Sequence, residues 1–323
     1  MIAIITRNAI HGGVETIIEM HARLLGAPVF VAGGLDDPHG TCPFPYTRTD
    51  TPEELAKSLQ GIEAIIYHWL PGWATDVIKA SGIPAIEYIH RIDTADGDRS
   101  VPRLTIAHSQ HLVDYIHLVN NIQGIGRPAR LVPYPLEIEE YPLAEGGLQI
   151  GGVTSYYSIK GLDTIIKARK MMRAHDGLLL TFYGSGSDLP RLQSIAAEQG
   201  VTAQMLGPAK KPKEVWKQYK LAISASLIEG GTPLAILEAL ACGIPAIVPE
   251  LPGCVELSQK ARAKGVDLPL YFFNGQPDDL ARVMSTVLQY ENNAEQTRTA
   301  MKTLFPPGEH IAAIQQAIKE VTE

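Results

Sequence analysis

The residues best suited to chemistry lie in one stretch of the second half, residues 226–248. Leu234–Cys242 is predicted to form a short helix, with Thr232 as its N-cap and Pro233 in the first helical position. This helix is apolar on every side except at Glu238, and a buried carboxylate needs hydrogen-bond donors. Because helical side chains lean toward the N-terminus, we expect Glu238 to reach back over the first turn.

The loop before this helix contains Glu229 and two glycines. Free backbone amides at a helix start attract anions, and glycines let the chain approach a ligand closely. We therefore predict a diphosphate at this loop and a ribose diol at Glu238. The alternative is a salt-bridged core glutamate beneath a glycine turn. The loop residues predicted to bind the donor are Gly230, Gly231, Thr232, Pro233 and Leu234.

These residues also carry a family resemblance. Ser-x-x-Glu-Gly at 226–230, followed by Leu-Glu-Ala-Leu-Ala-Cys-Gly-Ile-Pro at 237–245, resembles the signature of retaining, GT-B-type glycosyltransferases of family 4, the glycosyl transferases group 1. The resemblance implies that Glu229 contacts the donor sugar and that Glu238 holds the ribose. One departure concerns their spacing, because eight residues separate the two glutamates where the family usually has seven. The doubled glycine is expected to absorb the extra residue.

Composition limits the class of protein. With 323 residues, 45% hydrophobic and 20% charged, the chain suits two globular domains with ordinary cores. Its formal charge of −7 argues against a general nucleic-acid binder. No apolar run approaches the ~20 residues of a membrane span. Three cysteines without CxxC spacing fit a reducing compartment, so we expect a cytoplasmic protein.

Predicted strands and helices alternate almost throughout, which indicates an α/β fold with parallel sheets. In the first half the predicted strands are 2–6, 28–31, 64–69, 84–89, 103–107 and 130–132, and the helices are 52–60, 73–80 and 109–120, after one starting near Val14. In the second half the strands are 148–153, 178–183, 202–206, 221–225, 245–248 and 268–273. Helices are expected there at 161–174, 189–199, 212–219, 234–242, 252–264, 277–291, 294–304 and 309–322.

Residues 133–147, with three prolines and two glycines, are typical of an interdomain linker. We therefore expect a Rossmann-like acceptor domain over 1–140 and a Rossmann-like donor domain over 148–305. Two such halves fit the GT-B architecture, in which donor and acceptor meet in a cleft. The resemblance further implies that the last segment, 306–323, packs back on the first domain.

Lys160-Gly161 opens the helix after the first strand of the second half, where a lysine can neutralise a diphosphate. It matches the family's Lys-Gly, whose lysine contacts the donor diphosphate. The alternative is a solvated surface lysine. The family's preceding Gly-Arg pair reads Gly151-Gly152-Val153 here, so one cation is missing. Either the leaving group is less well stabilised, or Arg7 or Arg91 supplies the charge.

Four further sites follow from the resemblance. Gly12 and Gly13 form a loop expected near the donor phosphates or the acceptor, and His90, at a strand end, is expected to contact the sugar. Gly184 lies in a glycine loop beside the donor, and the backbone near Leu206 is expected to hold the base. We interpret His68, His108 and His111 as structural.

No histidine pair has zinc spacing, and Asp96-Gly97-Asp98 fits a solvated turn better than a metal site, so we expect neither a metal nor a cofactor. The basic cluster at 209–213 leaves a peripheral contact with an anionic membrane open. The sequence does not define the oligomeric state.

The predicted function is a metal-independent retaining glycosyltransferase that takes a sugar from a nucleoside diphosphate to an unknown acceptor. Glu229, His90 and Lys160 are its predicted catalytic residues. Three alternatives remain open: a GT-B nucleotide-sugar epimerase, a non-catalytic nucleotide-sugar-binding protein and a Rossmann dehydrogenase.

Overall fold

The structure, a computed structural model, describes residues 1–9, 12–34, 42–92, 101–172, 177–209 and 211–323. The chain divides into two compact units, each formed around its own parallel sheet. The N-terminal unit contains residues 1–135 together with 308–323, and the C-terminal unit contains residues 136–307. The segment 136–147, part of the expected linker, therefore lies within the C-terminal unit.

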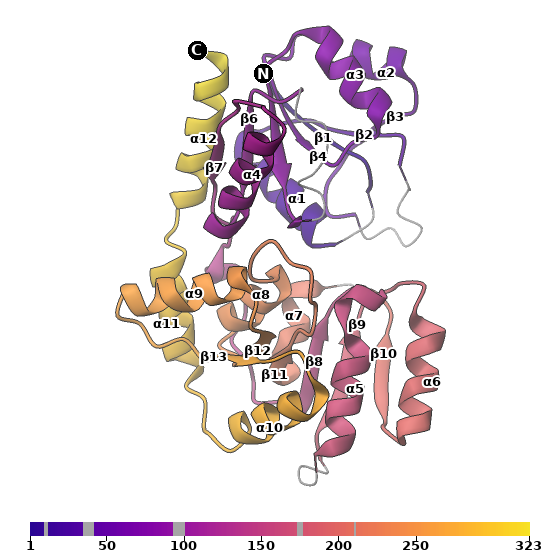
Figure 1. Cartoon of the computed structure of the whole chain (residues 1–323), viewed down its shortest axis with the longest axis vertical. Helices are drawn as coiled ribbons and strands as arrows, with labels where there is room; N and C mark the ends of the chain where they lie inside the picture. Colours follow the sequence, from indigo (N-terminus) through magenta and orange to yellow (C-terminus); the bar gives the residue numbers. More distant parts are fainter. Residues whose placement is uncertain (10–11, 35–41, 93–100, 173–176, 210) are drawn as a thin grey trace. The chain divides into compact units, whose positions relative to one another are not determined.

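The N-terminal unit has a seven-stranded sheet in the order β3-β2-β1-β4-β5-β6-β7, with all neighbours parallel (Figure 1). Its strands are β1 (Ile2–Thr6), β2 (Val29–Ala32), β3 (Thr47–Thr49), β4 (Ala64–His68), β5 (Ala85–Ile89), β6 (Leu104–Ala107) and β7 (Ala129–Leu131). Its helices are α1 (Gly13–Leu25), α2 (Pro52–Ser58), α3 (Gly72–Ser81), α4 (Gln110–Ile122) and α12 (Glu309–Thr322). The central strands are almost wholly buried, as expected for a parallel sheet covered on both faces.

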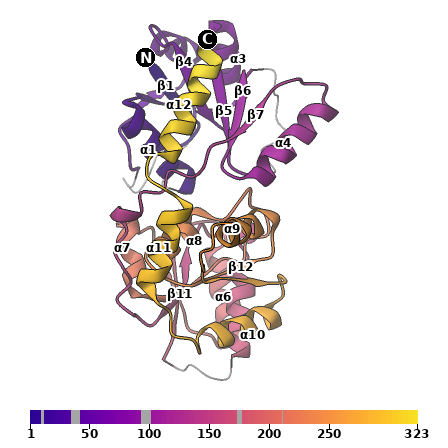
Figure 2. The ribbon, with the colours of Figure 1, turned by 90° about the vertical axis from the view of Figure 1, so that its left-hand side faces the viewer.

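Helix α12 belongs to the N-terminal unit although it comes last in the sequence, and it packs against β4, β5 and β6 (Figure 2). Its apolar side chains are buried there, and two arginines of the unit bind its end. Arg103 donates to the carbonyl of Val321 at 2.9 Å, and Arg130 pairs with Glu320 at 2.8 Å. The C-terminal helix is thus an integral part of the first unit's core.

The C-terminal unit has a six-stranded parallel sheet in the order β10-β9-β8-β11-β12-β13. Its strands are β8 (Gln149–Val153), β9 (Leu179–Tyr183), β10 (Ala203–Leu206), β11 (Tyr219–Ile223), β12 (Ala246–Pro249) and β13 (Leu270–Phe273). Its helices are α5 (Leu162–Met171), α6 (Leu189–Gln199), α7 (Pro212–Val215), α8 (Leu234–Ala241), α9 (Pro252–Ala263), α10 (Pro277–Val287) and α11 (Ala294–Leu304). Its described residues also form short 3₁₀ turns at η2 (Ile138–Glu140), η3 (Ser158–Lys160) and η4 (Trp216–Gln218).

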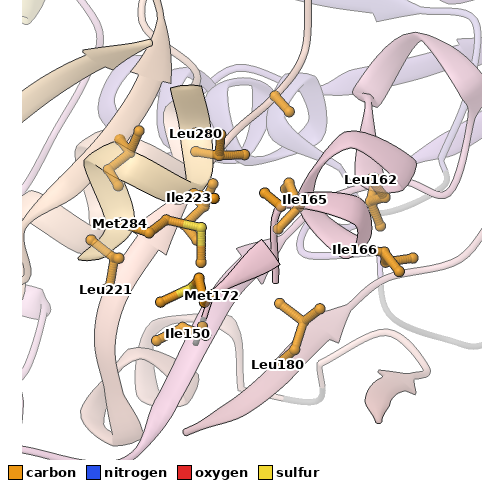
Figure 3. Packing of buried hydrophobic residues seen from close by; sticks show 14 of the residues in the cluster. Ile150, Leu162, Ile165, Ile166, Met172, Leu180, Leu221, Ile223, Leu280 and Met284 are labelled. Atoms are coloured by element: carbon orange, nitrogen blue, oxygen red, sulfur yellow. The ribbon is translucent and has the colours of Figure 1, made fainter. Parts of the chain in front are cut away.

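The main core of this unit forms where α5 and α10 pack on the strands. Figure 3 shows Ile165 from α5 and Met284 from α10 meeting Ile150 and Ile223 from β8 and β11. Helix α8 packs instead against β11 and β12 and is covered by α11. The helix that carries Glu238 is therefore buried between the sheet and a second helix.

The structure confirms the α/β class with two parallel sheets and corrects local expectations. Strand β3 (Thr47–Thr49) was not predicted, because a three-residue edge strand of polar residues has no apolar pattern. Strand β11 begins at Tyr219, two residues earlier than expected, because Tyr219 already pairs with Gln149 of β8. The helix predicted over 212–219 was wrong in its second half, where η4 tightens the chain before the strand.

Candidate functional site

The predicted N-cap of α8 was wrong. The helix begins at Leu234, its N-cap is Pro233 with φ −54° and ψ 136°, and the carbonyl of Pro233 accepts from the amides of Ile236 and Leu237. The Thr232 side chain is buried, and its hydroxyl donates to the carbonyl of Gly253 at 3.3 Å. Thr232 therefore ties the loop to α9 instead of capping α8.

The glycine loop before α8 is packed tightly against the start of α9. A Cβ on Gly253 would lie 2.5 Å from Cα of Gly231, so only glycine fits at that position of α9. The thiol of Cys254 lies 3.9 Å from the carbonyl of Gly231. These contacts fix the backbone of the loop, as a preorganised amide site for an anion requires.

Lys160 and Glu229, two of the predicted catalytic residues, form an ion pair. Nζ of Lys160 lies 2.7 Å from Oε1 of Glu229, and the two side chains are 21% and 12% exposed. The turn after Lys160 lies against the end of β11 and requires glycine at position 161. Gly161 has a φ of +64°, and a Cβ there would lie 2.3 Å from the carbonyl of Ala225. Ser226 strengthens the junction by donating from its hydroxyl to the carbonyl of Ile159 at 3.3 Å.

Glu238 is buried, with 7% of its surface exposed, as the apolar helix predicts. Its carboxylate accepts from the Tyr141 hydroxyl and from Nε1 of Trp216, both at 3.4 Å. Burial raises the pKa of Glu238 to about 7, and these two hydrogen bonds and the charge of Lys213 offset only part of that rise. Both of these donors are neutral, and no described lysine, arginine or histidine forms an ion pair with Glu238, which differs from the salt-bridged core glutamate of the alternative interpretation.

The loops after β8, β9 and β10 meet at the carboxyl edge of the C-terminal sheet, where open α/β folds bind ligands. The amide of Gly184 donates to the carbonyls of Leu206 and Gly207, both at 3.3 Å. A Cβ on Gly184 would lie 1.9 Å from the carbonyl of Thr154, so this turn requires glycine. The sequence analysis missed Tyr156, whose buried hydroxyl shares its proton between the carbonyls of Leu206 (2.5 Å) and Phe182 (2.9 Å).

In the N-terminal unit, Gly12 and Gly13 lie at the start of α1, with Gly12 as its extended N-cap. The carboxylate of Glu15 folds back over this turn, because a Cβ on Gly12 would lie 2.9 Å from its Oε2. Burial raises the pKa of Glu15 to about 7. A carboxyl group here supplies no positive charge for a phosphate and can hydrogen-bond a hydroxyl in either protonation state, so this turn suits a hydroxyl-bearing ligand better than a phosphate.

His90 follows β5 and is half-buried. Its Nε2 lies 2.8 Å from Nδ1 of His68, the last residue of β4, and the two rings stack with centroids 5.1 Å apart. His108, after β6, stacks with His90 at 6.2 Å and with Tyr134 at 4.1 Å. His68 and His108, two of the three histidines interpreted as structural, thus contact the one predicted to be catalytic.

Arg7, one of the two arginines considered as a substitute for the missing cation, lies after β1 and next to Trp69 after β4. Its guanidinium carbon is 4.9 Å from the centre of the Trp69 ring. Trp69 is 57% exposed and has a left-handed φ of +38°, which is unusual for a bulky residue. The structure therefore places Arg7 in a cation–π contact.

Within the described ranges, no group of three or more His, Cys, Asp or Glu side chains is arranged to hold a metal ion. Asp96-Gly97-Asp98 lies outside the described residues, as does Lys210 of the basic cluster. None of the helices in the described parts of the chain has the length and apolar character that a membrane span requires.

Two Rossmann-like units, each with a parallel sheet whose carboxyl-edge loops carry the candidate residues, define the GT-B class of protein. Residues 148–290 match the profile of the family described as glycosyl transferases group 1. The match includes Lys160, Glu229 and Glu238, and it confirms the resemblance seen in the sequence.

Solved structures share the fold over the whole chain at low sequence identity. The chain is similar to HepE of Anabaena, solved in complex with UDP-glucose, with a TM-score of 0.77 and 16% identity, covering 100% of this chain and 99% of that one. It is also similar to the lipopolysaccharide outer core galactosyltransferase WaaB in its apo form, with a TM-score of 0.66, 17% identity and 99% of both chains covered.

A shorter sequence match involves an exopolysaccharide phosphotransferase of Streptomyces coelicolor. It is 33% identical over 91 residues, which are 27% of this chain and 10% of that protein. The chain therefore matches about a tenth of the length of this relative.

Proposed function

We propose that the protein is a metal-independent, retaining glycosyltransferase that uses a uridine-diphosphate hexose as donor. The observation that carries the proposal is the Lys160–Glu229 pair beside the glycine loop of α8, inside the region that matches glycosyl transferases group 1. The complex of HepE with UDP-glucose supports a UDP-sugar as the first donor to test.

Lys160 and the backbone N–H groups of Gly230, Gly231, Thr232 and Leu234 would stabilise the leaving diphosphate; Pro233 has no N–H to donate. Negative charge grows on that group in the transition state, so a fixed cation and fixed amides contribute most there. In the free protein Glu229 holds Lys160 ready at 2.7 Å. When the donor binds, the lysine would turn to the diphosphate and the freed carboxylate of Glu229 would orient the sugar hydroxyls.

Glu238 would accept both hydroxyls of the ribose. A carboxylate accepts two hydrogen bonds best when it is ionised. The pKa of Glu238 in the free protein is about 7, so this group is only partly ionised below pH 7. Donor binding should therefore release a proton below pH 7, and donor affinity should rise with pH up to about 7. His90 in the N-terminal unit would contact the sugar, and the Gly12–Gly13 turn would bind the acceptor.

A thermal-shift screen with UDP-, GDP-, ADP- and TDP-glucose tests the donor assignment, because a ligand of the native state raises its apparent stability. Calorimetric titration of Glu238→Gln then tests the ribose contact. We expect about a tenfold loss of UDP affinity from the loss of a charged acceptor. The exposed Glu291→Gln is the control. Unchanged affinity for UDP would remove the ribose assignment.

The activity itself is tested with UDP-glucose and a broad panel of saccharide acceptors. We expect transfer with retention of the anomeric configuration. An isomerised sugar nucleotide formed without acceptor would identify an epimerase instead, and tight binding without turnover would identify a binding protein. A preference for NAD over every sugar nucleotide would contradict the proposal.

A further inference from the structure

A histidine lies at the carboxyl end of each of three neighbouring strands of the N-terminal sheet. His68 ends β4, His90 follows β5 and His108 follows β6, and these strands are adjacent in the sheet. The rings form a stacked row at the carboxyl edge, where α/β sheets bind ligands. His68 is buried and His90 is half-buried, so His90 is the more accessible of this hydrogen-bonded pair.

The contact between His68 and His90 allows only two arrangements. Nδ1 of His68 and Nε2 of His90 are 2.8 Å apart, so one nitrogen carries a proton and the other offers a lone pair. Burial keeps the pKa of both rings well below the ordinary value of 6.5, so both are neutral at physiological pH. Each neutral ring has one N–H, and its position on one ring therefore fixes its position on the other.

The environment of Nε2, the second ring nitrogen of His68, decides which of the two proton arrangements is favoured. Nε2 of His68 is buried and has no hydrogen-bond partner among the residues that the structure describes. If His68 accepted at Nδ1, its proton would sit on Nε2 as an unpaired buried donor, which costs about 1–3 kcal/mol. If His68 donates from Nδ1, Nε2 holds only a lone pair, and unpaired acceptors are tolerated more often than unpaired N–H groups. The second arrangement is favoured.

A second histidine pair in the same unit follows this rule. Nδ1 of His310 contacts the carbonyl of Pro133, which can only accept, so His310 carries its proton there. Its Nε2 must then accept from Nε2 of His21, 2.9 Å away. This leaves Nδ1 of His21 as a bare nitrogen, and it too is buried with no partner in the described part of the chain.

We propose that His68 is a positioning residue that fixes His90 as the Nδ1–H tautomer, so that His90 meets the sugar as a hydrogen-bond donor. The lone pair on Nε2 of His90 is used by His68, so His90 does not act as a base through that nitrogen. The contact with the sugar rests on the proposed function, whereas the tautomer rests only on the structure of the N-terminal unit.

Nitrogen-15 NMR of protein labelled in histidine tests the tautomer without any ligand. We expect the bare-nitrogen shift at Nε2 of His90 and the protonated-nitrogen shift at Nδ1, with His90→Asn used to assign the signals. His68→Phe keeps a ring in the stack but removes the donor, and it should allow His90 to populate both tautomers. A proton on Nε2 of His90 in the wild-type protein would overturn the proposal.

Binding of UDP-glucose relative to UDP tests the consequence for the sugar. UDP lacks the sugar, so the ratio of Kd for UDP to Kd for UDP-glucose isolates the sugar contact. A general loss of folding affects both Kd values and leaves this ratio unchanged. We expect His68→Phe to reduce this ratio about three- to fivefold, because only the fraction of His90 that carries its proton on Nδ1 then binds the sugar as a donor. His68→Asn, whose amide can replace the Nδ1–H donor, should stay within about 1.5-fold of the wild-type ratio.

Two substitutions of His90, by asparagine and by glutamine, test which of its ring nitrogens contacts the sugar. His90→Asn keeps a donor near Nδ1 and should retain more of the UDP-glucose preference than His90→Gln, whose amide lies near Nε2. The reverse order, or an equal loss in His68→Asn and His68→Phe, would overturn the positioning role. If UDP-glucose does not bind to the wild-type protein, the proposed function fails, while the NMR result still decides the tautomer.

Discussion

Replacing Glu238 with glutamine should stabilise the protein at alkaline pH and leave it almost unchanged in acid. Glu238 is buried in α8, and the described residues give it two long hydrogen bonds, from Tyr141 and Trp216. Its pKa of about 7 lies above the ordinary 4.5, so the folded state binds more protons than the unfolded state between these values. The stability provided by the protonated acid is therefore present below pH 4.5 and is lost as pH rises to about 7.

The size of this effect follows from the shift. The pKa moves from 4.5 to about 7, and at about 1.4 kcal/mol per unit the wild-type protein loses about 3 kcal/mol over this range. Glutamine has the same shape and no charge to bury. Between pH 5 and pH 8 the stability of Glu238→Gln relative to wild type should therefore rise by about 2–3 kcal/mol.

Urea unfolding followed by tryptophan fluorescence measures this difference. Trp216 lies against Glu238, whereas Trp69 and Trp73 belong to the N-terminal unit. Changing both of the latter to Phe leaves Trp216 as a reporter of the C-terminal unit alone, which matters because two units need not unfold together. Glu291→Gln, at an exposed position, is the control. A pH-independent difference between Glu238→Gln and wild type would refute this reasoning.

Three further outcomes are expected. Lys160→Ala should lower kcat more than it weakens UDP-glucose binding, since leaving-group charge grows in the transition state; equal losses in steady-state kinetics and calorimetry would contradict this. Burial lowers the pKa of His310 to about 4, so its contribution to stability is present above pH 6.5 and lost as pH falls toward 4. His310→Asn can still donate to Pro133, and its urea midpoint should fall less between pH 7 and pH 5 than that of the wild-type protein. An equal fall in both proteins would show that His310 does not cause the pH dependence. Trp69→Gly should be about 1 kcal/mol more stable than Trp69→Ala in thermal unfolding, because glycine adopts the left-handed φ without strain. A more stable Trp69→Ala would show that position 69 is not strained.

Much of the fold could be predicted because its signals are local. Alternating apolar runs and helical periodicity located most strands and helices to within a few residues, and helices α6 and α11 have the predicted bounds. The errors fall where a contact distant in sequence decides the local structure. Tyr219 joins β11 because it pairs with Gln149, and Thr232 leaves its capping role because its hydroxyl reaches Gly253.

The candidate site was predictable in its residue types and less so in its contacts. Motif spacing identified Lys160 and Glu229 separately, but their ion pair joins positions 69 residues apart that no local pattern connects. Tyr141 and Trp216 could not be assigned to Glu238 from sequence, because each belongs to a different element. Five histidines gather in one unit for the same reason, since they come from the ends of three strands and from two helices.

The position of α12 has a consequence for how the polypeptide is made. On the ribosome, residues 1–135 emerge first, yet the helix that covers β4, β5 and β6 is synthesised only after the entire C-terminal unit. The nascent first unit must wait with an open apolar face, where Ile314, Ala317 and Val321 will later be buried. Translation that stops near residue 307 would leave this face uncovered, a substrate for chaperones and proteases.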